Sequence, residues 1–158
     1  TSIAAIAGAR IYGCNRSPAK REAAREAGAH EVYADAGELA GKNLGVIDFV
    51  GIGSTVNVAI AAVRDGGRVV LVGLGANEVQ LTTLPLIQRQ LSVAGAWCSS
   101  RQELAEVLDL IAAGRISSVL EEISLDEVPE GYARLHRGEV PGRLVAMIDQ
   151  ADGRNRKQ

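Results

Sequence analysis

Residues 45–76, GVIDFVGIGSTVNVAIAAVRDGGRVVLVGLGA, decide the fold. Two apolar, branched runs, residues 46–50 and 69–72, are typical of strands that are buried on both faces. Between them, residues 55–63 are rich in alanine and valine and long enough for about two and a half helical turns. The order of strand, helix and strand predicts a βαβ unit, whose two strands are parallel.

Glycines follow each of these two strands. Gly51 and Gly53 come after the first strand, and Gly73 and Gly75 come after the second. Open parallel sheets bind ligands beyond the carboxyl ends of their strands. Because glycine lets a backbone come close to a neighbouring group, this pattern predicts a nucleotide-type crevice at this edge of the sheet.

Length and composition are those of a soluble globular domain. The chain has 158 residues, 47% of them hydrophobic, and a net charge of −2, which gives no reason to expect nucleic acid or a membrane as partner. Cys14 and Cys98 lie in apolar runs, so we expect two buried thiols rather than a disulfide or a zinc site. The sequence has no membrane-length apolar run and no signal-peptide pattern, so we expect a cytoplasmic location.

The segments before the central unit also alternate between helix and strand. We expect a helix over residues 1–7, a strand over 10–14, a helix over 18–27 that is capped by Ser17, and a strand over 30–34. An order that begins with a bare helix predicts a doubly wound parallel α/β sheet that lacks its first strand.

After the central unit, Pro85 makes residues 77–90 unlikely to form a central strand. Residues 91–98 read as a strand, and Ser100 with Glu103 forms a capping-box pair that opens a helix closed by Gly114.

The last part of the chain repeats the capping signal. Ser124 and Glu127 form a second capping-box pair, but Pro129 predicts a short turn there before a helix that ends near Gly138. A final strand follows over residues 144–148. We assign residues 1–149 to a partial dinucleotide-binding domain and residues 150–158 to a polar tail.

Six segments, taken in order and at their spacing, carry a family resemblance. The chain resembles the cofactor-binding half of the medium-chain dehydrogenase/reductase family, in its zinc-type alcohol dehydrogenase branch. The resemblance implies a Rossmann-like sheet whose phosphate-binding turn would lie before Thr1. The segments are GARIYGCNRSPAK, VIDFVG, GGRVVLVGLG, LSVAGAW followed by SSRQELAEVLDLIAAGRI, LDEVPEGYARL, and GEVPGRLVAMI.

The resemblance implies an adenosine site after the strand over residues 10–14. Asn15 stands where NAD-dependent relatives place an acid that accepts the ribose hydroxyls, and an amide does not repel the 2′-phosphate of NADP. Arg16 could pair that phosphate or lie over the adenine, and Lys20 matches a lysine that reaches the ribose. NAD and NADP both remain open, and the overall likeness favours NAD. The alternative role of these residues is a solvated helix start.

The resemblance also implies that strand ends line the ribose and the nicotinamide, in part through backbone groups. The alternative is simple core packing. Ser99, where the family has glycine, weakens the assignment of the residue before it. The implied residues are Phe49, Val50, Gly51, Val72, Gly73, Leu74, Ala96 and Cys98.

The charged and titratable residues that do not belong to this set have other expected roles. Arg143 matches an arginine that reaches the cofactor's pyrophosphate, and its alternative role is a surface salt bridge. We expect Asp48 to be a structural hydrogen-bond acceptor for a nearby loop, and His30 and His136 to lie on the surface. The sequence shows no nucleophile–base pair and no metal constellation, so we expect no catalytic or metal-ligating residue in this chain.

As an activity, the resemblance implies hydride transfer between NAD(P) and an alcohol or aldehyde. Zinc and most of the substrate pocket would belong to a catalytic domain outside this chain, so we expect the chain alone to be inactive and to bind nucleotide very weakly. The strand over residues 91–98 would pair two subunits into a homodimer. A zinc-free NADPH quinone or enoyl reductase and a non-catalytic nucleotide-binding or interaction module remain as alternatives.

Overall fold

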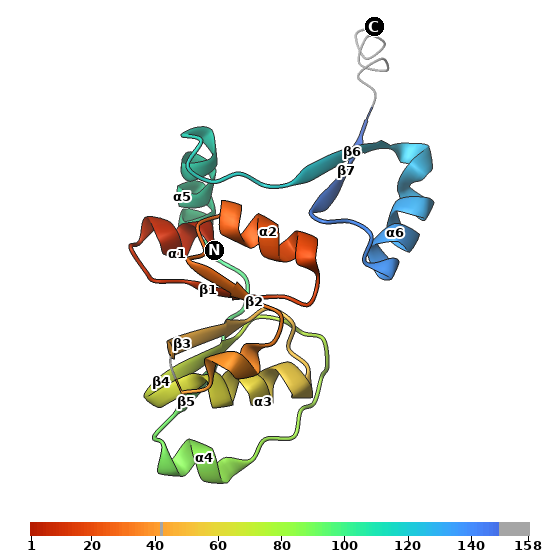
Figure 1. Cartoon of the computed structure of the whole chain (residues 1–158). Helices are drawn as coiled ribbons and strands as arrows, with labels where there is room; N and C mark the ends of the chain where they lie inside the picture. The colour runs from red at the N-terminus through yellow and green to blue at the C-terminus, as the bar shows by residue number, and fades with distance from the viewer. Residues whose placement is uncertain (42, 149–158) are drawn as a thin grey trace, which may run out of the picture. The chain divides into compact units, whose positions relative to one another are not determined.

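The computed structural model describes residues 1–41 and 43–148, and the chain divides into two compact units at the bond between Asp109 and Leu110 (Figure 1). The predicted polar tail, residues 150–158, lies outside the described residues, and the assignment of residues 1–149 to one functional domain stays a prediction. The elements are α1 (Ser2–Ile6), β1 (Tyr12–Cys14), α2 (Pro18–Glu26), β2 (Glu31–Tyr33), η1 (Ala36–Leu39), β3 (Asn43–Asp48), α3 (Gly53–Ala62), β4 (Val63–Leu71), α4 (Thr83–Gln88), β5 (Ser92–Gly95), α5 (Arg101–Ala112), β6 (Leu120–Ser124), η2 (Leu125–Glu127), α6 (Val128–Arg137) and β7 (Arg143–Met147).

Every strand pair in the described residues is parallel, which confirms the predicted Rossmann-like α/β class. The strands form three sheets rather than one, in the orders β1-β2, β3-β4-β5 and β6-β7. In a doubly wound sheet of order 3-2-1-4-5-6, the pair 3-2 and the trio 4-5-6 flank strand 1. In the first unit, the sheet β1-β2 corresponds to the pair of strands 2 and 3, and the sheet β3-β4-β5 corresponds to the trio 4-5-6. A first strand between them stays a prediction.

The central βαβ unit is confirmed, but its boundaries differ from those predicted. Helix α3 covers one face of the sheet β3-β4-β5 and passes directly into β4 at Val63 (Figure 1). Gly66 and Gly67 lie inside β4, where Gly66 has a φ of 73°. A Cβ at Gly67 would lie 2.7 Å from the carbonyl oxygen of Arg64. The glycine pair therefore permits the irregularity that shifts the β3-β4 register.

The hydrophobic core lies between α3 and this sheet. Val56, Ala59 and Ile60 of α3 are buried with Val63 and Val69 of β4, at spacings that place the helical residues on one face. Burial of each valine side chain contributes about 1.5–3 kcal/mol relative to exposure. Partly buried residues surround this cluster: Val46, Leu71, Val79, Leu81, Leu86, Leu91 and Val93.

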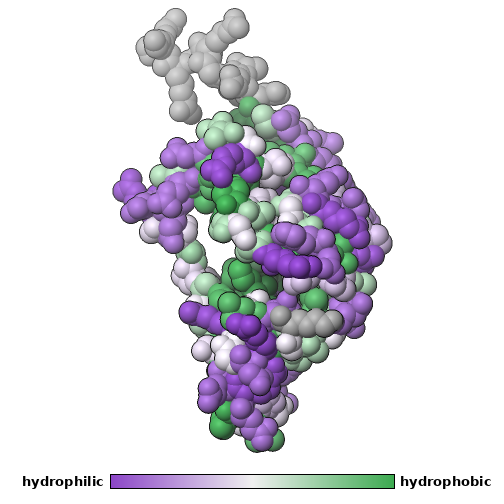
Figure 2. Space-filling model, turned by 60° about the vertical axis from the view of Figure 1, so that its left-hand side comes forward, coloured by the Kyte–Doolittle hydropathy of each residue, from purple (hydrophilic) through white to green (hydrophobic). Residues whose placement is uncertain are grey.

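The segments outside this core are thinly packed. Helix α2 lies on the β1-β2 pair through small residues, and a Cβ at Gly13 would lie 3.3 Å from the Cβ of Ala24. Helix α5 leaves apolar side chains exposed, at Leu104, Leu108 and Ile111. Figure 2 shows hydrophobic surface (green) interrupting the hydrophilic surface (purple) on one face of the molecule.

The second unit places α6 on the parallel pair β6-β7. Gly131 packs closely there, because a Cβ on it would lie 3.0 Å from the side chains of both Ile123 and Leu144.

Both predicted capping boxes are present: the Glu127 carboxylate accepts from the Ser124 amide at 2.7 Å, and the Glu103 carboxylate accepts from the Ser100 amide at 2.6 Å. The predicted turn before α6 and its end at Gly138 are confirmed.

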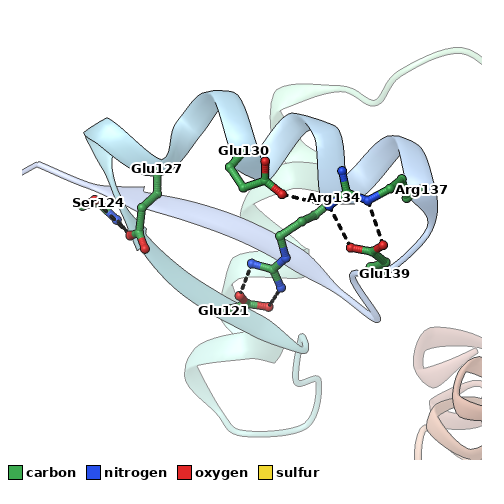
Figure 3. A network of polar contacts seen from close by, with 7 residues as sticks. All are labelled: Glu121, Ser124, Glu127, Glu130, Arg134, Arg137 and Glu139. Carbon is green, nitrogen blue, oxygen red and sulfur yellow. Dashed lines mark hydrogen bonds and ion pairs between the residues drawn. The ribbon is translucent and has the colours of Figure 1, made fainter.

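Ion pairs hold α6 to β6 and to the segment after α6 (Figure 3). Arg134 donates two hydrogen bonds to the Glu121 carboxylate, at 2.6 and 3.0 Å, and this pair lowers the pKa of Glu121 and raises that of Arg134. Arg137 bridges Glu130 and Glu139, and the same interactions raise its pKa. Both arginines therefore have a structural role, because a guanidinium group can donate two hydrogen bonds to one carboxylate or bridge two carboxylates.

The two cysteines contradict the sequence prediction, because Cys14 and Cys98 are both exposed. The strands are shorter than the apolar runs: Cys14 is the last residue of β1, and Cys98 follows the end of β5 with a φ of 51°. Partial desolvation, together with the carboxylates of Asp35 and Glu38, still raises the pKa of the Cys14 thiol. None of the helices in the described residues has the length and apolar character that crossing a membrane requires.

Candidate functional site

Three neighbouring strands end in register at one edge of the sheet β3-β4-β5. Asp48 at the end of β3 lies opposite Leu71 of β4, which in turn lies opposite Gly95 of β5. Because the strands are parallel, the chain leaves all three at the same edge, where open α/β sheets bind ligands. We call the segments that follow the first rim loop (residues 49–53), the second rim loop (72–76) and the third rim loop (96–100).

Asp48 organises the first rim loop. Its carboxylate Oδ1 accepts from the amides of Val50 at 2.8 Å and Gly51 at 3.1 Å, and Oδ2 accepts from the Thr55 hydroxyl at 2.7 Å. Its backbone carbonyl also accepts from the first two amides of the second rim loop, at 2.9 and 3.0 Å. The predicted role of Asp48 as a structural acceptor is therefore confirmed. Sequence reasoning missed Thr55, although its place in the first turn of a helix after a glycine loop is a recognisable capping signal.

The first two rim loops are joined by their backbones. The amide of Gly75 donates to the carbonyl of Val50 at 2.9 Å, and the amide of Ala76 donates to the carbonyl of Gly51 at 3.0 Å. Each of these peptide groups is thereby satisfied within the chain. The two loops form one structural element.

Glycine is required at these positions for contact between the loops. Gly51 has a φ of 70°, and a Cβ there would clash with the carbonyl group of Gly73. A Cβ at Gly75 would lie 2.6 Å from the carbonyl oxygen of Val50. The close backbone approach that the sequence predicts thus occurs between two loops of the chain itself, and their glycines do not by themselves indicate a ligand.

Apolar side chains are nevertheless exposed along the rim, so they are not part of the core. The exposed fractions are 41% for Val72 and 51% for Val50, whereas Val69, three residues earlier in β4, is fully buried. Trp97 was missed by the sequence reasoning, although it is the chain's only tryptophan and lies between two predicted site residues. The most exposed large hydrophobic residues of the rim are Phe49 at 70%, Leu74 at 70% and Trp97 at 81%.

Several backbone groups of the rim remain available. The amides of Val72 and Ala96 are used by Asp48 and Leu71, which leaves their carbonyls. Within the described residues, the amides of Leu74 and Cys98 donate no hydrogen bond. The rim therefore offers both acceptors and donors beside apolar side chains, which is the usual character of a small-molecule site.

The predicted adenosine residues follow β1, at the start of α2. The Asn15 side-chain oxygen accepts from the Ser17 amide at 3.0 Å, and Ser17 occupies the cap position without a side-chain cap bond. Arg21, which sequence reasoning missed, donates to the carbonyls of Asn15 at 2.8 Å and Arg16 at 2.9 Å. Because the side-chain oxygen of Asn15 is used in this turn, its side-chain nitrogen is the group that could bind a ligand. The side chains of Arg16 and Lys20 form no ion pair with the described residues.

Arg143 belongs to the second unit, whereas the other predicted site residues belong to the first. It begins β7, and its amide donates to the carbonyl of Val119 at 2.9 Å. Its side chain is exposed and forms no ion pair within the described residues, so the predicted alternative, a surface salt bridge, is not present there.

The described residues contain no cluster that could hold a metal ion. The Nδ1 atom of His30 accepts from the Ile11 amide at 3.1 Å, and His136 lies exposed, as predicted.

Two open hollows, one in each unit, contain none of the predicted site residues. In the first, the Arg89 guanidinium is already bound to Asp65 at 2.9 Å and to carbonyls at the end of α3. In the second, acidic side chains would repel a phosphate. The first, of about 420 Å³, is lined by Gly41, Arg64, Asp65 and Arg89, and the second, of about 470 Å³, by residues 122–127 and Met147.

Comparison with known proteins gives a consistent result. The family described as zinc-binding dehydrogenase matches residues 1–113. Alcohol dehydrogenase 2 of Caenorhabditis elegans is 34% identical over 102 residues, which cover 64% of this chain and 29% of that protein. The probable formaldehyde dehydrogenase AdhA of Bacillus subtilis is 32% identical over 146 residues, covering 89% of this chain and 42% of that protein.

Solved structures agree with the sequence relatives. Acetophenone reductase from Geotrichum candidum, in complex with NAD, superposes with a TM-score of 0.88 at 27% identity, covering 95% of this chain and 45% of that one. The chain thus spans less than half the length of these relatives. The predicted membership of the medium-chain dehydrogenase/reductase family is confirmed, and the chain belongs to its zinc-binding dehydrogenases.

Proposed function

We propose that this chain is the dinucleotide-binding part of an oxidoreductase that transfers hydride between NAD(P) and an alcohol or aldehyde. The observation that carries the proposal is the row of three strand ends in register, with exposed apolar side chains and unused backbone groups beside them. The relative solved in complex with NAD supports it, as do relatives named alcohol and formaldehyde dehydrogenase. Those names favour this activity over the quinone reductase and non-catalytic alternatives.

At the rim, the chain would orient the nicotinamide. The carbonyls of Val72 and Ala96 are suited to accept from the carboxamide nitrogen, and the amides of Leu74 and Cys98 to donate to its oxygen. Phe49, Val50, Gly51 and Gly73 would supply an apolar wall and its backbone support. The bound nicotinamide would supply the hydride chemistry, and these residues would hold its ring in place and exclude water from it.

At the other end of the cofactor, Asn15, Arg16 and Lys20 would contact the adenosine part. The role of Arg143 at the pyrophosphate, which the family resemblance implies, stays a prediction. The side-chain oxygen of Asn15 is used by Ser17, so Asn15 would offer a donor to the ribose or to a 2′-phosphate. We keep both NAD and NADP as cofactors, with NAD favoured by overall likeness and by the neighbour that binds it.

The described residues offer no ligand set for zinc. If the enzyme uses zinc, its ligands and most of the substrate pocket would come from residues outside this chain. We further propose a cytoplasmic enzyme.

We also propose a homodimer formed through residues 91–98. Among the described residues, β5 pairs only with β4, so its other edge is free to pair with a second copy. Sedimentation at high protein concentration tests this proposal: a dimer is expected, and a strictly monomeric species would contradict it.

The single tryptophan makes the function testable. Because Trp97 lies on the rim, NADH bound there should quench its emission by energy transfer, with weak affinity in the 158-residue chain. We expect ADP-ribose, which lacks the nicotinamide, to quench far less. The chain alone should show no turnover with alcohols. Equal quenching by both compounds, or none by NADH at millimolar concentration, would overturn the proposed site.

A further inference from the structure

We propose that Asp48 is a positioning residue: it couples the first two rim loops to the core and thereby sets the fit of the nicotinamide end of the cofactor. This inference rests on the proposed function. Asp48 is only 6% exposed and would not itself touch the ligand. It would act through the loops that carry Phe49, Val50, Val72 and Leu74.

Asp48 accepts five hydrogen bonds, three at its carboxylate and two at its backbone carbonyl. The carboxylate accepts two amides of the first rim loop and a hydroxyl of α3, while the backbone carbonyl accepts two amides of the second rim loop. A buried carboxylate must find such donors, since an unpaired buried charge is strongly unfavourable. Asp48 is therefore held in one geometry, and so are its five donors.

The hydrogen bonds continue from the first rim loop to the second. The amides of Val50 and Gly51 donate to the Asp48 carboxylate, and the carbonyls of the same two residues accept from the amides of Gly75 and Ala76. Hydrogen bonds in such a chain polarise one another. Removal of the Asp48 carboxylate should therefore weaken the hydrogen bonds that the second rim loop donates.

Thr55 links Asp48 to the helix that carries the core. The Thr55 hydroxyl has one proton and two possible acceptors, Asp48 Oδ2 at 2.7 Å and the Ile52 carbonyl at 3.0 Å. The shorter, charge-assisted bond is the stronger. Thr55 precedes Val56, which is 1% exposed in the core cluster, so the rim geometry is tied to the best-packed helix of the chain.

The first experiment needs no cofactor. Amide hydrogen exchange would be measured in the 158-residue chain for the wild type and D48N, with D109N as a control that removes an exposed acid of α5. We expect D48N to speed exchange at Gly75 and Ala76 about tenfold relative to amides within α3, because a charged hydrogen bond is lost. D109N should leave this ratio unchanged. An unchanged ratio in D48N would overturn the coupling.

If D48N fails to fold, Thr55 provides a gentler pair of variants. T55S keeps the hydroxyl that binds Asp48, whereas T55V removes it and keeps the side-chain volume. We expect T55V to speed exchange at Gly75 and Ala76, and T55S to match the wild type. Equal behaviour of the two variants would overturn the inference.

The second experiment separates this inference from the proposed function. Binding of NADH and of ADP-ribose would be compared in the wild type and T55V. If the loops set the nicotinamide fit, T55V weakens NADH binding severalfold and leaves ADP-ribose binding unchanged; equal weakening of both would contradict a positioning role. A wild type that binds NADH no better than ADP-ribose would refute the proposed function, whatever the exchange data show.

Discussion

Within the first unit, residues 43–95 enclose a buried core, whereas residues 1–33 contain no buried residue. Both regions consist of parallel strands with a covering helix, and their local sequence signals are equally clear. In the central region, branched side chains of α3 and β4 pack against one another. In the amino-terminal region, α2 meets β1 and β2 through glycine and alanine, and Ile3 and Ile6 of α1 remain 54% and 37% exposed.

A helix–strand pattern in the sequence therefore does not guarantee a self-supporting unit. Two short strands with one helix bury too little apolar surface for independent stability, whereas three strands with a packed helix bury enough. We therefore expect the central region to unfold last and the amino-terminal region to open locally.

The largest expected effect comes from the core. Replacing Ile60 by alanine should destabilise the chain by about 2–5 kcal/mol, because it leaves a cavity among residues that cannot collapse around it. The matched change of Ile3 to alanine, at an exposed position, should cost less than about 0.5 kcal/mol. Urea unfolding followed by circular dichroism measures both, and equal losses would refute the contrast between the two regions.

A smaller effect is expected at the rim. Replacing Gly51 by alanine combines a left-handed backbone with a clash against Gly73, and we expect a loss of about 1–3 kcal/mol together with loss of Trp97 quenching by NADH. Gly53, in the same loop, has no atom within 4 Å of an added Cβ, so its alanine variant should match or slightly exceed the wild type. Similar stabilities of the two variants would show that the loops are not interlocked.

The amino-terminal region can be tested through selectivity rather than stability. N15D places a carboxylate where a 2′-phosphate would lie, so NADPH binding should fall about tenfold relative to NADH, through like-charge repulsion. Competition between NADH and NADPH, followed by the quenching of Trp97, gives the ratio of their affinities. A ratio that N15D leaves unchanged would mean that this region takes no part in cofactor choice.

The smallest expected effect is at the start of α5. Hydrogen bonds from the Ser100 amide and hydroxyl lower the pKa of Glu103 below its ordinary 4.5. A lowered pKa in the folded state gives stability that is present above pH 4.5 and is lost as the pH falls through the folded value. NMR titration of Glu103 should show the lowered pKa, and E103Q should abolish this part of the pH dependence while keeping the capping bond. A Glu103 that titrates at 4.5 would contradict the cap.

What could be predicted from sequence was local. The central strand–helix–strand unit, both capping boxes and the turn before α6 follow from residues close together in the chain, and the structure contains all of them. The structural role of Asp48 was also predictable, because a carboxylate inside an apolar run needs donors nearby.

What could not be predicted depends on contacts between segments. Strand pairing decides where β1 and β5 end, so the apolar runs gave no warning that Cys14 and Cys98 would be exposed. The division into three sheets is likewise a property of pairing. At the rim, Gly51 and Gly73 look the same in sequence whether they approach a nucleotide or each other, and only the structure shows the contact between them.

NMR titration of the isotope-labelled chain with NADH decides whether the rim of β3-β4-β5 holds the nicotinamide. We expect the amide shifts to concentrate at Phe49, Val50, Leu74 and Cys98, and ADP-ribose to leave these four unchanged. Shifts confined to the Arg64 and Arg89 hollow, or identical shifts with both compounds, would contradict this placement of the nicotinamide.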